Sequence, residues 1–268
     1  PWTVRYFIWL GNVVRGDFGT SLKTHTAVWN DIRARLPNTL KLTLAAFTLA
    51  LIFSIPVGVY CAIRRNSIFD YIATVVSVAG VSIPSFWLGL MLILLFAVQL
   101  GWLPSFGRGD TVALGWWTTG LLTTSGLKSL ILPSITLALF QTTLIMRLVR
   151  AEMLEVLRTD YIRFARARGL TDRAVHFGHA LRNTLVPVIT ITGLQLGSII
   201  AFAIITETVF QWPGMGLLFI QAVTFADIPV MAAYLCFIAA VFVTLNLIVD
   251  LLYYAVDPRL RVERGTGH

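Results

Sequence analysis

The chain of 268 residues is 57% hydrophobic and only 13% charged, and its mean hydropathy is +0.79. A soluble domain carries about 25% charged residues, so the composition excludes an ordinary soluble domain and predicts an integral membrane protein. The net charge of +8 does not favour nucleic-acid binding, because the arginines flank apolar runs, where arginine usually records membrane orientation.

Residues 1–41 form the first predicted element, an external segment that precedes the first long apolar run. Aromatic and aliphatic residues between Trp2 and Leu10 predict an interfacial helix, which ends before a turn at residues 16–19, GDFG. Its simplest role is that of a lid on the rest of the protein.

Five charge-free runs are long enough to cross a hydrocarbon layer of ~30 Å, which takes about 20 apolar residues in a helix. They lack the alternation of barrel strands, and backbone polar groups in lipid must be satisfied internally. The sequence therefore predicts an all-α, polytopic transmembrane helical bundle. The runs are 42–63, 71–103, 129–146, 183–206 and 228–249.

The orientation of these runs follows from where arginine collects. The loop at 147–186 is rich in arginine and is therefore cytoplasmic by the positive-inside rule, as are Arg64 and Arg65 and a basic tail at 259–268. This parity requires that residues 71–103 form one span, kinked or broken near Pro84.

The same parity places residues 207–227 outside, as a re-entrant or surface element with Trp212 at headgroup depth, and residue 1 is then external too. Arg33, Arg35 and Lys41 lie on that external side, against the rule. A sixth span before residue 1 would explain the exception, because the first helix usually fixes orientation. We therefore expect that an N-terminal span is missing from this sequence.

The arginine-rich loop itself contains two short helical patterns. Thr159 or Asp160 can cap a helix that runs to Arg168, and Gly169 supplies the positive φ that ends it. Thr171 can then cap a second helix that leads into the next span. The residues alone leave two interpretations open: docking of a partner protein, or an amphipathic hairpin on anionic headgroups. A helix-turn-helix DNA reader is disfavoured, because the second helix runs into the bilayer.

The amino-acid sequence of this loop resembles that of a known protein family. Residues 160–170, DYIRFARARGL, with residues 179–183 and Pro187, resemble the signature loop of permease subunits of bacterial binding-protein-dependent ABC importers, in its dipeptide/oligopeptide form. The general signature opens Glu-Ala-Ala, whereas this chain has Arg163, Phe164 and Ala165. Further segments agree with the same branch: 16–21, 67–70, 83–87, 206–216, 250–253 and 257–259.

The resemblance implies a type I importer permease fold, with a transmembrane permease domain at 42–258 in the bacterial inner (plasma) membrane. It implies half of a translocation path for di- or oligopeptides, a second homologous permease subunit, two ATP-binding subunits and an external solute-binding protein. The chain has no phosphate loop, so ATP and Mg²⁺ would bind to the partner ATPases, and this subunit would be non-catalytic, without a cofactor or metal of its own.

Two sets of site residues follow from the resemblance, while the residues of the substrate path stay unknown. The ATPase-coupling set is Asp160, Tyr161, Arg163, Ala165, Arg166, Ala167, Gly169, Leu170 and Arg182. The external set is Glu207, Trp212, Pro213, Gly214 and Gly216.

Two rival functions are weighed against transport driven by a partner ATPase. A secondary transporter normally carries acidic groups or broken helices inside its spans, and these span interiors lack acids. A membrane-embedded enzyme needs converging nucleophiles, bases or metal ligands; His176 and His179 share a helix face, but two histidines make a weak metal site. The identity of the cargo cannot be read from the sequence.

Overall fold

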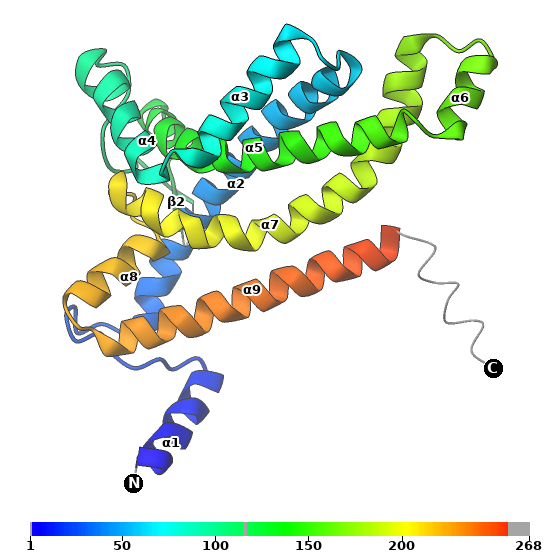
Figure 1. The fold of residues 1–268 in the computed structure, drawn as a ribbon. Helices are drawn as coiled ribbons and strands as arrows, with labels where there is room; N and C mark the ends of the chain where they lie inside the picture. Colours follow the sequence, from blue (N-terminus) through cyan, green and yellow to red (C-terminus); the bar gives the residue numbers. More distant parts are fainter. Residues whose placement is uncertain (1, 115–116, 257–268) are drawn as a thin grey trace, which may run out of the picture. The chain divides into compact units, whose positions relative to one another are not determined.

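The structure is a computed structural model that describes residues 2–114 and 117–256. Its elements, in chain order, are mostly helices (Figure 1), with one short β-hairpin and two π-helical segments, η1 and η2. The predicted basic tail at 259–268 lies outside the described residues. The elements are α1 (Trp2–Val14), α2 (Val28–Ile63), α3 (Ile68–Ser82), α4 (Ser85–Leu92), η1 (Ile93–Gln99), β1 (Val112–Leu114), β2 (Trp117–Thr119), α5 (Thr124–Val156), α6 (Asp160–Ala167), η2 (Ala174–Ala180), α7 (Leu181–Val209), α8 (Met215–Thr224) and α9 (Ile228–Val256).

Within the described residues, four helical stretches are long and apolar enough to cross a membrane: α2, α5, η2 with α7, and α9. A fifth candidate span consists of α3 followed by α4 and η1, and it is broken between Ser82 and Ser85. Ile83 there has an extended backbone, because Pro84 lacks an N–H and disfavours a helical conformation in the residue before it. The predicted break near Pro84 is confirmed.

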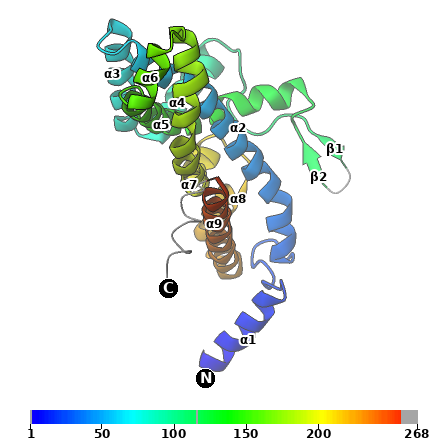
Figure 2. The ribbon, with the colours of Figure 1, turned by 90° about the vertical axis from the view of Figure 1, so that its right-hand side faces the viewer.

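The beginning of the first span differs from the prediction. The helix α2 starts at Val28, so the boundary expected between residues 41 and 42 lies inside a continuous helix. Arg33, Arg35 and Lys41 ended the charge-free run without ending the helix, because long basic side chains are good helix formers. The β-hairpin was also not predicted, and it is a small addition to a helical chain; Figure 2 shows β1 and β2 projecting from the helices of their unit.

The chain divides into two compact units, and α2, α5, α7 and α9 each contribute one part to each unit. Unit 1 comprises residues 1–45, 85–136 and 200–242. Its core joins the first turns of α2 to α8 and the first half of α9, through buried residues that include Ile32, Met215 and Tyr234. The rings of Phe219 and Tyr234 stack there at 4.5 Å between centroids.

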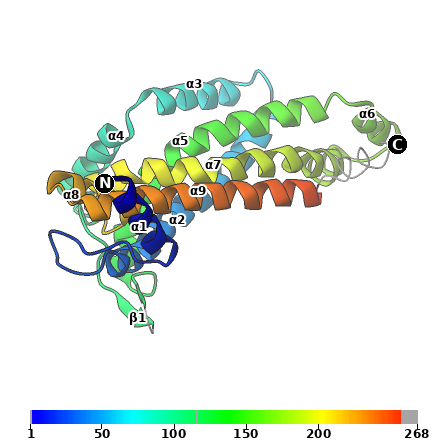
Figure 3. The same cartoon turned by 90° about the horizontal axis from the view of Figure 1, so that it is seen from below.

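Unit 2 comprises residues 46–84, 137–199 and 243–268, and small residues allow its helices to approach closely. Gly58 of α2 faces the backbone of α5 so closely that an added Cβ would lie 2.8 Å from the Met146 carbonyl oxygen. The first half of α7 and the last part of α9 lie side by side (Figure 3), with Gly193 against Val249.

Candidate functional sites in the two units

The short helix α6 of unit 2 connects the end of α5 to the segment that leads into α7 (Figure 1). Thr159 precedes it with an extended backbone, and Gly169, at φ +79°, ends it as the sequence predicts. The Thr159 hydroxyl donates back to the Val156 carbonyl at 2.7 Å and does not cap the helix. Thr171 is the side-chain cap of the next helical segment, accepting from the Ala174 amide at 3.4 Å.

One face of α6 is fixed to its own unit. Ile162 is fully buried and Ala165 is 5% exposed. The helix α6 packs against η2. The Tyr161 hydroxyl and His179 Nδ1 of η2 form a hydrogen bond at 2.6 Å, with the donor set by the histidine tautomer. The sequence placed Ala165 in a partner contact, but its side chain is already covered by the chain itself.

The other face of α6 is open and both apolar and basic. Phe164 is 64% exposed and Leu170 is 41% exposed, and Arg166 and Ala167 are also exposed. Arg163 pairs with Asp160 at 3.1 Å, but both side chains are largely in solvent, so this pair contributes little stability. Gly169 and Arg182 are exposed as well. The predicted coupling residues from Asp160 to Leu170 thus lie on α6 and the turn after it, with Ala165 as the one turned inward, whereas Arg182 lies at the start of α7.

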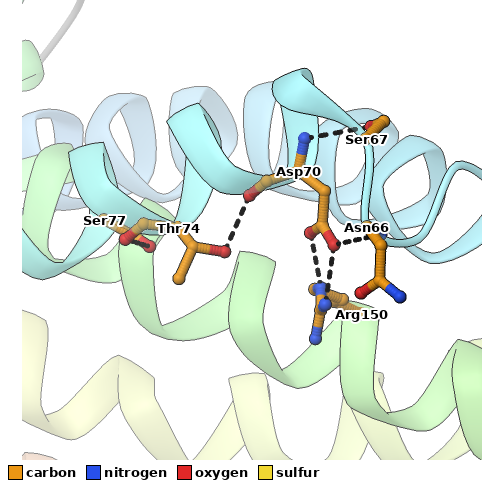
Figure 4. Close-up of polar contacts among 6 residues, drawn as sticks. All are labelled: Asn66, Ser67, Asp70, Thr74, Ser77 and Arg150. Atoms are coloured by element: carbon orange, nitrogen blue, oxygen red, sulfur yellow. Dashed lines mark hydrogen bonds and ion pairs between the residues drawn. The ribbon is translucent and has the colours of Figure 1, made fainter.

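An ion pair that the sequence did not predict joins α3 to α5 in unit 2 (Figure 4). Arg150 donates from Nε to Asp70 Oδ1 at 2.7 Å and from Nη2 to Oδ2 at 2.8 Å. The backbone amide of Asn66 donates to Oδ2 at 3.1 Å, and the Ser67 hydroxyl accepts from the Asp70 amide at 3.2 Å. The Ser-x-x-Asp pattern at 67–70 is a helix-capping signal, but only the fold reveals its partner on α5.

In unit 1, Glu207 near the end of α7 is fully buried and holds the start of α8. Its carboxylate accepts from the backbone amides of Gly216 at 2.6 Å and Leu217 at 3.1 Å, and from the Thr39 hydroxyl at 2.6 Å. The Thr39 hydroxyl oxygen also accepts from the Met215 amide at 2.8 Å. The first three amides of α8 are therefore satisfied by α2 and α7, and negative charge is favoured at a helix N-terminus.

Two glycines make this contact possible. A Cβ on Gly214 would overlap the Glu207 carboxylate, and a Cβ on Gly216 would lie 2.5 Å from Ile204 Cα. The external set that the sequence predicted is therefore brought together, although around a buried carboxylate.

Trp212 is the exception to the prediction for this segment. Expected at headgroup depth, it is 4% exposed and donates from Nε1 to the Asn38 carbonyl at 3.1 Å. Asn38 Nδ2 donates to the Pro213 carbonyl at 2.8 Å, and Arg108 Nη1 donates to Asn38 Oδ1 at 2.7 Å. A buried tryptophan needs a partner for its N–H, and the carbonyl on α2 supplies it.

A second carboxylate of unit 1 joins the N-terminal segment to the loop before α9. Asp227 is 2% exposed and its Oδ2 accepts from the Ser21 hydroxyl at 2.5 Å and from the Lys23 amide at 3.3 Å. Burial acts to raise the pKa of Asp227, but these hydrogen bonds outweigh burial and hold the pKa below its ordinary value. In the described part of the chain, no three His, Cys, Asp or Glu residues cluster as a metal site would require.

These features define a class: a multi-span helical membrane protein with a basic loop that exposes a short, rigidly seated helix. Residues 54–262 match the model of the family described as "binding-protein-dependent transport system inner membrane component". The chain belongs to this family, and it is a transport subunit of a membrane importer and not an enzyme.

Relatives agree along almost the whole chain. The chain is 41% identical over 273 residues to the dipeptide transport system permease protein of Alkalihalophilus pseudofirmus, which covers 97% of this chain and 82% of the relative. It is 42% identical to the di/tripeptide transport system permease protein of Pseudomonas aeruginosa (98% and 82% covered). It is 45% identical to the oligopeptide transport system permease protein of Bacillus subtilis (97% and 81% covered).

Solved structures show the same fold at low sequence identity. The methionine ABC transporter MetNI, in inward-facing conformations, superposes with a TM-score of 0.64 at 19% identity, over 82% of this chain and 93% of that one. An amino acid ABC transporter determined with histidines superposes with a TM-score of 0.61 at 15% identity, over 85% and 94%. The expected type I importer permease fold is confirmed.

Proposed function

We propose that this chain forms half of the path through which an ATP-driven importer carries di- or oligopeptides. The cargo class is supported by its relatives, which are named as dipeptide, di/tripeptide and oligopeptide permeases. The other expected subunits are a second homologous permease, two ATPases that bind ATP and Mg²⁺, and an external solute-binding protein. A secondary transporter is not favoured by these relationships.

The proposed orientation places the loop at 147–186, which includes α6, at the cytoplasmic face, together with Arg64 and Arg65. The positive-inside rule supports it, because α6 and its flanks are the most arginine-rich stretch of the chain. Residue 1 and the element at 207–227, with α8 and the buried Glu207, then lie toward the external face. This chain itself is proposed to bind no cofactor.

The open face of α6 is proposed as the contact with an ATPase subunit, and this exposed face is the observation that carries the proposal. A helix that transmits motion must be rigid on one side and free on the other. Ile162 and Ala165 are buried on one side of α6, which packs against η2, whereas Phe164 and Leu170 are exposed. Exposed apolar side chains rimmed by arginine are typical of an interaction surface.

The test uses the full-length protein in its complete transporter, reconstituted in proteoliposomes, with ATP hydrolysis stimulated by the loaded binding protein as readout. Phe164→Asp with Leu170→Asp should reduce the stimulated rate at least tenfold, because charged groups replace the apolar contact. Leu122→Asp is the matched control, since Leu122 is 66% exposed in unit 1, and it should retain the rate.

Three further variants distinguish the buried side of α6 from its exposed side. Ala165→Leu should uncouple hydrolysis by displacing α6 from η2, and Gly169→Pro should do so by removing the positive φ that ends the helix. Ala167→Leu adds the same volume on the exposed side and tests how closely the partner approaches. Normal stimulated hydrolysis in the Phe164/Leu170 variant would refute α6 as the coupling contact.

A further inference from the structure

An open groove of about 470 Å³ lies in unit 2 beside the Asp70–Arg150 ion pair. Its walls come from the short loop between α2 and α3, from the last turns of α5 and from Arg158 just beyond the end of α5. The volume is in the range of small-ligand sites. The lining residues are Arg65, Asn66, Arg150, Ala151, Leu154, Glu155 and Arg158.

Three arginines and one glutamate line the groove, so its lining is positive overall. Arg65 and Arg158 are exposed on its walls, and among the described residues no ion pair joins either of them to Glu155. Arg150 is held in place by Asp70 through Nε and Nη2, and neither of these bonds uses Nη1. Planar arginine groups in such an arrangement suit the oxygens of a phosphate.

The surface next to the groove is apolar, as expected at the edge of a membrane. Ile68 is 79% exposed at the start of α3, and Tyr71 and Ile72 are 61% and 56% exposed. The rings of Tyr60 and Phe69 meet edge to face at 4.9 Å, and both side chains are partly exposed. Exposed aromatic side chains close in sequence to a basic loop and an apolar helix are typical of the headgroup level of a bilayer.

We propose that this groove binds the phosphate headgroup of an anionic phospholipid, whose acyl chains lie along the exposed face of α3. Arg65 and Arg158 contact the phosphate, and Asp70 acts as a positioning residue that fixes Arg150 at the floor.

The apolar flank favours a lipid over an ATPase subunit as the occupant. A water-soluble ATPase surface could cover the arginines, but it would leave the large side chains of Ile68, Tyr71 and Ile72 against water. A phospholipid covers both parts with one molecule, because its charge and its hydrocarbon are joined at the depth where the arginines meet the apolar helix.

The experiment measures lipid binding to the full-length transporter complex in detergent by native mass spectrometry, with phosphatidylglycerol and phosphatidylcholine as probes. Each arginine near an anionic headgroup contributes about fivefold to binding, so Arg65→Gln with Arg158→Gln should weaken phosphatidylglycerol binding about 25-fold. Arg147→Gln with Arg173→Gln removes two exposed arginines outside the groove and should change it less than twofold. Phosphatidylcholine should bind weakly to all three proteins.

A second variant keeps every charge. Ala151→Trp fills the groove from an exposed position on α5 and should weaken phosphatidylglycerol binding at least tenfold. Equal binding of phosphatidylglycerol to the groove variants and to the control pair would overturn the proposal. So would a wild-type complex that is saturated by glycerol 3-phosphate and retains no phosphatidylglycerol. If the groove variants lost the ATPase subunit and still bound phosphatidylglycerol as wild type does, the groove would be assigned to the ATPase, and this would also overturn the proposal.

Discussion

Arg150 on α5 binds both carboxylate oxygens of Asp70 on α3, at 2.7 Å and 2.8 Å. This ion pair connects α3 to α5, the helix that ends just before α6. The Asp70 side chain is 3% exposed and the Arg150 side chain is 30% exposed. Removal of the carboxylate leaves a half-buried guanidinium without its partner. Because that group keeps some access to water, the cost is expected below that of a fully buried pair.

Asp70→Ala should therefore lower the free energy of unfolding by about 1–3 kcal/mol. The measurement is the thermal melting of the full-length protein in detergent, followed by intrinsic tryptophan fluorescence. Asp250→Ala is the matched control in the same unit, because Asp250 is exposed, and it should change stability by less than about 0.5 kcal/mol. Addition of Arg150→Leu to Asp70→Ala should recover part of the loss; a further additive loss would show that the two side chains act independently.

Gly58 tests whether close helix packing holds unit 2 together. A Cβ at this position would lie 2.8 Å from a backbone oxygen of α5, which cannot move as a side chain can, so Gly58→Ala should destabilise the protein by about 1–3 kcal/mol. Gly178→Ala is the opposite case, because no atom lies within 4 Å of its added Cβ. It should be neutral or stabilise by up to about 1 kcal/mol. Equal melting temperatures for the two variants would contradict the packing.

The positions of the spans could be predicted from the sequence because charge-free runs of bilayer length have few alternatives, and the break at Pro84 follows from one residue. The start of α2 at Val28 could not, since a charged turn ends an apolar run without ending a helix. The loop signature at 160–170 located α6. It could not show which side of α6 is buried, because Ala165 and Ala167 differ only in their position relative to η2.

The contacts made by single carboxylates were the least accessible to prediction. Glu207 was singled out at the end of its span, yet its partners come from Thr39 on α2 and from the start of α8. Asp70 was noted only in the segment 67–70 that agrees with the family resemblance, and Arg150 only in the arginine-rich loop. These partners are 80 and 168 residues apart in the sequence, so no local pattern could predict that they interact.

Gly214 should be the most sensitive residue of the Glu207 contact. Its backbone is extended and not left-handed, so a side chain would be tolerated there if space allowed, but a Cβ would overlap the Glu207 carboxylate. Gly214→Ala should therefore displace α8 and lower the free energy of unfolding by about 1–3 kcal/mol. Gly11→Ala, on an exposed helix of the same unit with open space around it, should not. Unchanged melting of the Gly214 variant would contradict the buried contact.

Asp227 gives a pH dependence with a defined sign. Its folded pKa lies below the ordinary value of about 3.9, because hydrogen bonds from Ser21 and from backbone amides outweigh the opposing effect of burial. The stability that it contributes is therefore complete above about pH 4 and is lost as the pH falls through the lower folded pKa. Asp227→Asn removes hydrogen bonds to a charged acceptor and should cost about 1.5–3 kcal/mol at pH 7.

The melting temperatures of wild type and Asp227→Asn should consequently differ by a constant amount between pH 5 and 7, which is roughly one to three units above the ordinary carboxyl pKa. The two melting temperatures should converge as the pH falls through the folded pKa of Asp227. Ser21→Ala separates the local contact from the general effect of acid. The Ser21 hydroxyl donates directly to Oδ2 of Asp227. Ser21→Ala should therefore lower the melting temperature substantially in the wild-type background and hardly at all in the Asp227→Asn background. A difference that grows as the pH falls would mean that the folded state favours protonated Asp227, and the N-terminal segment would then be held by other contacts.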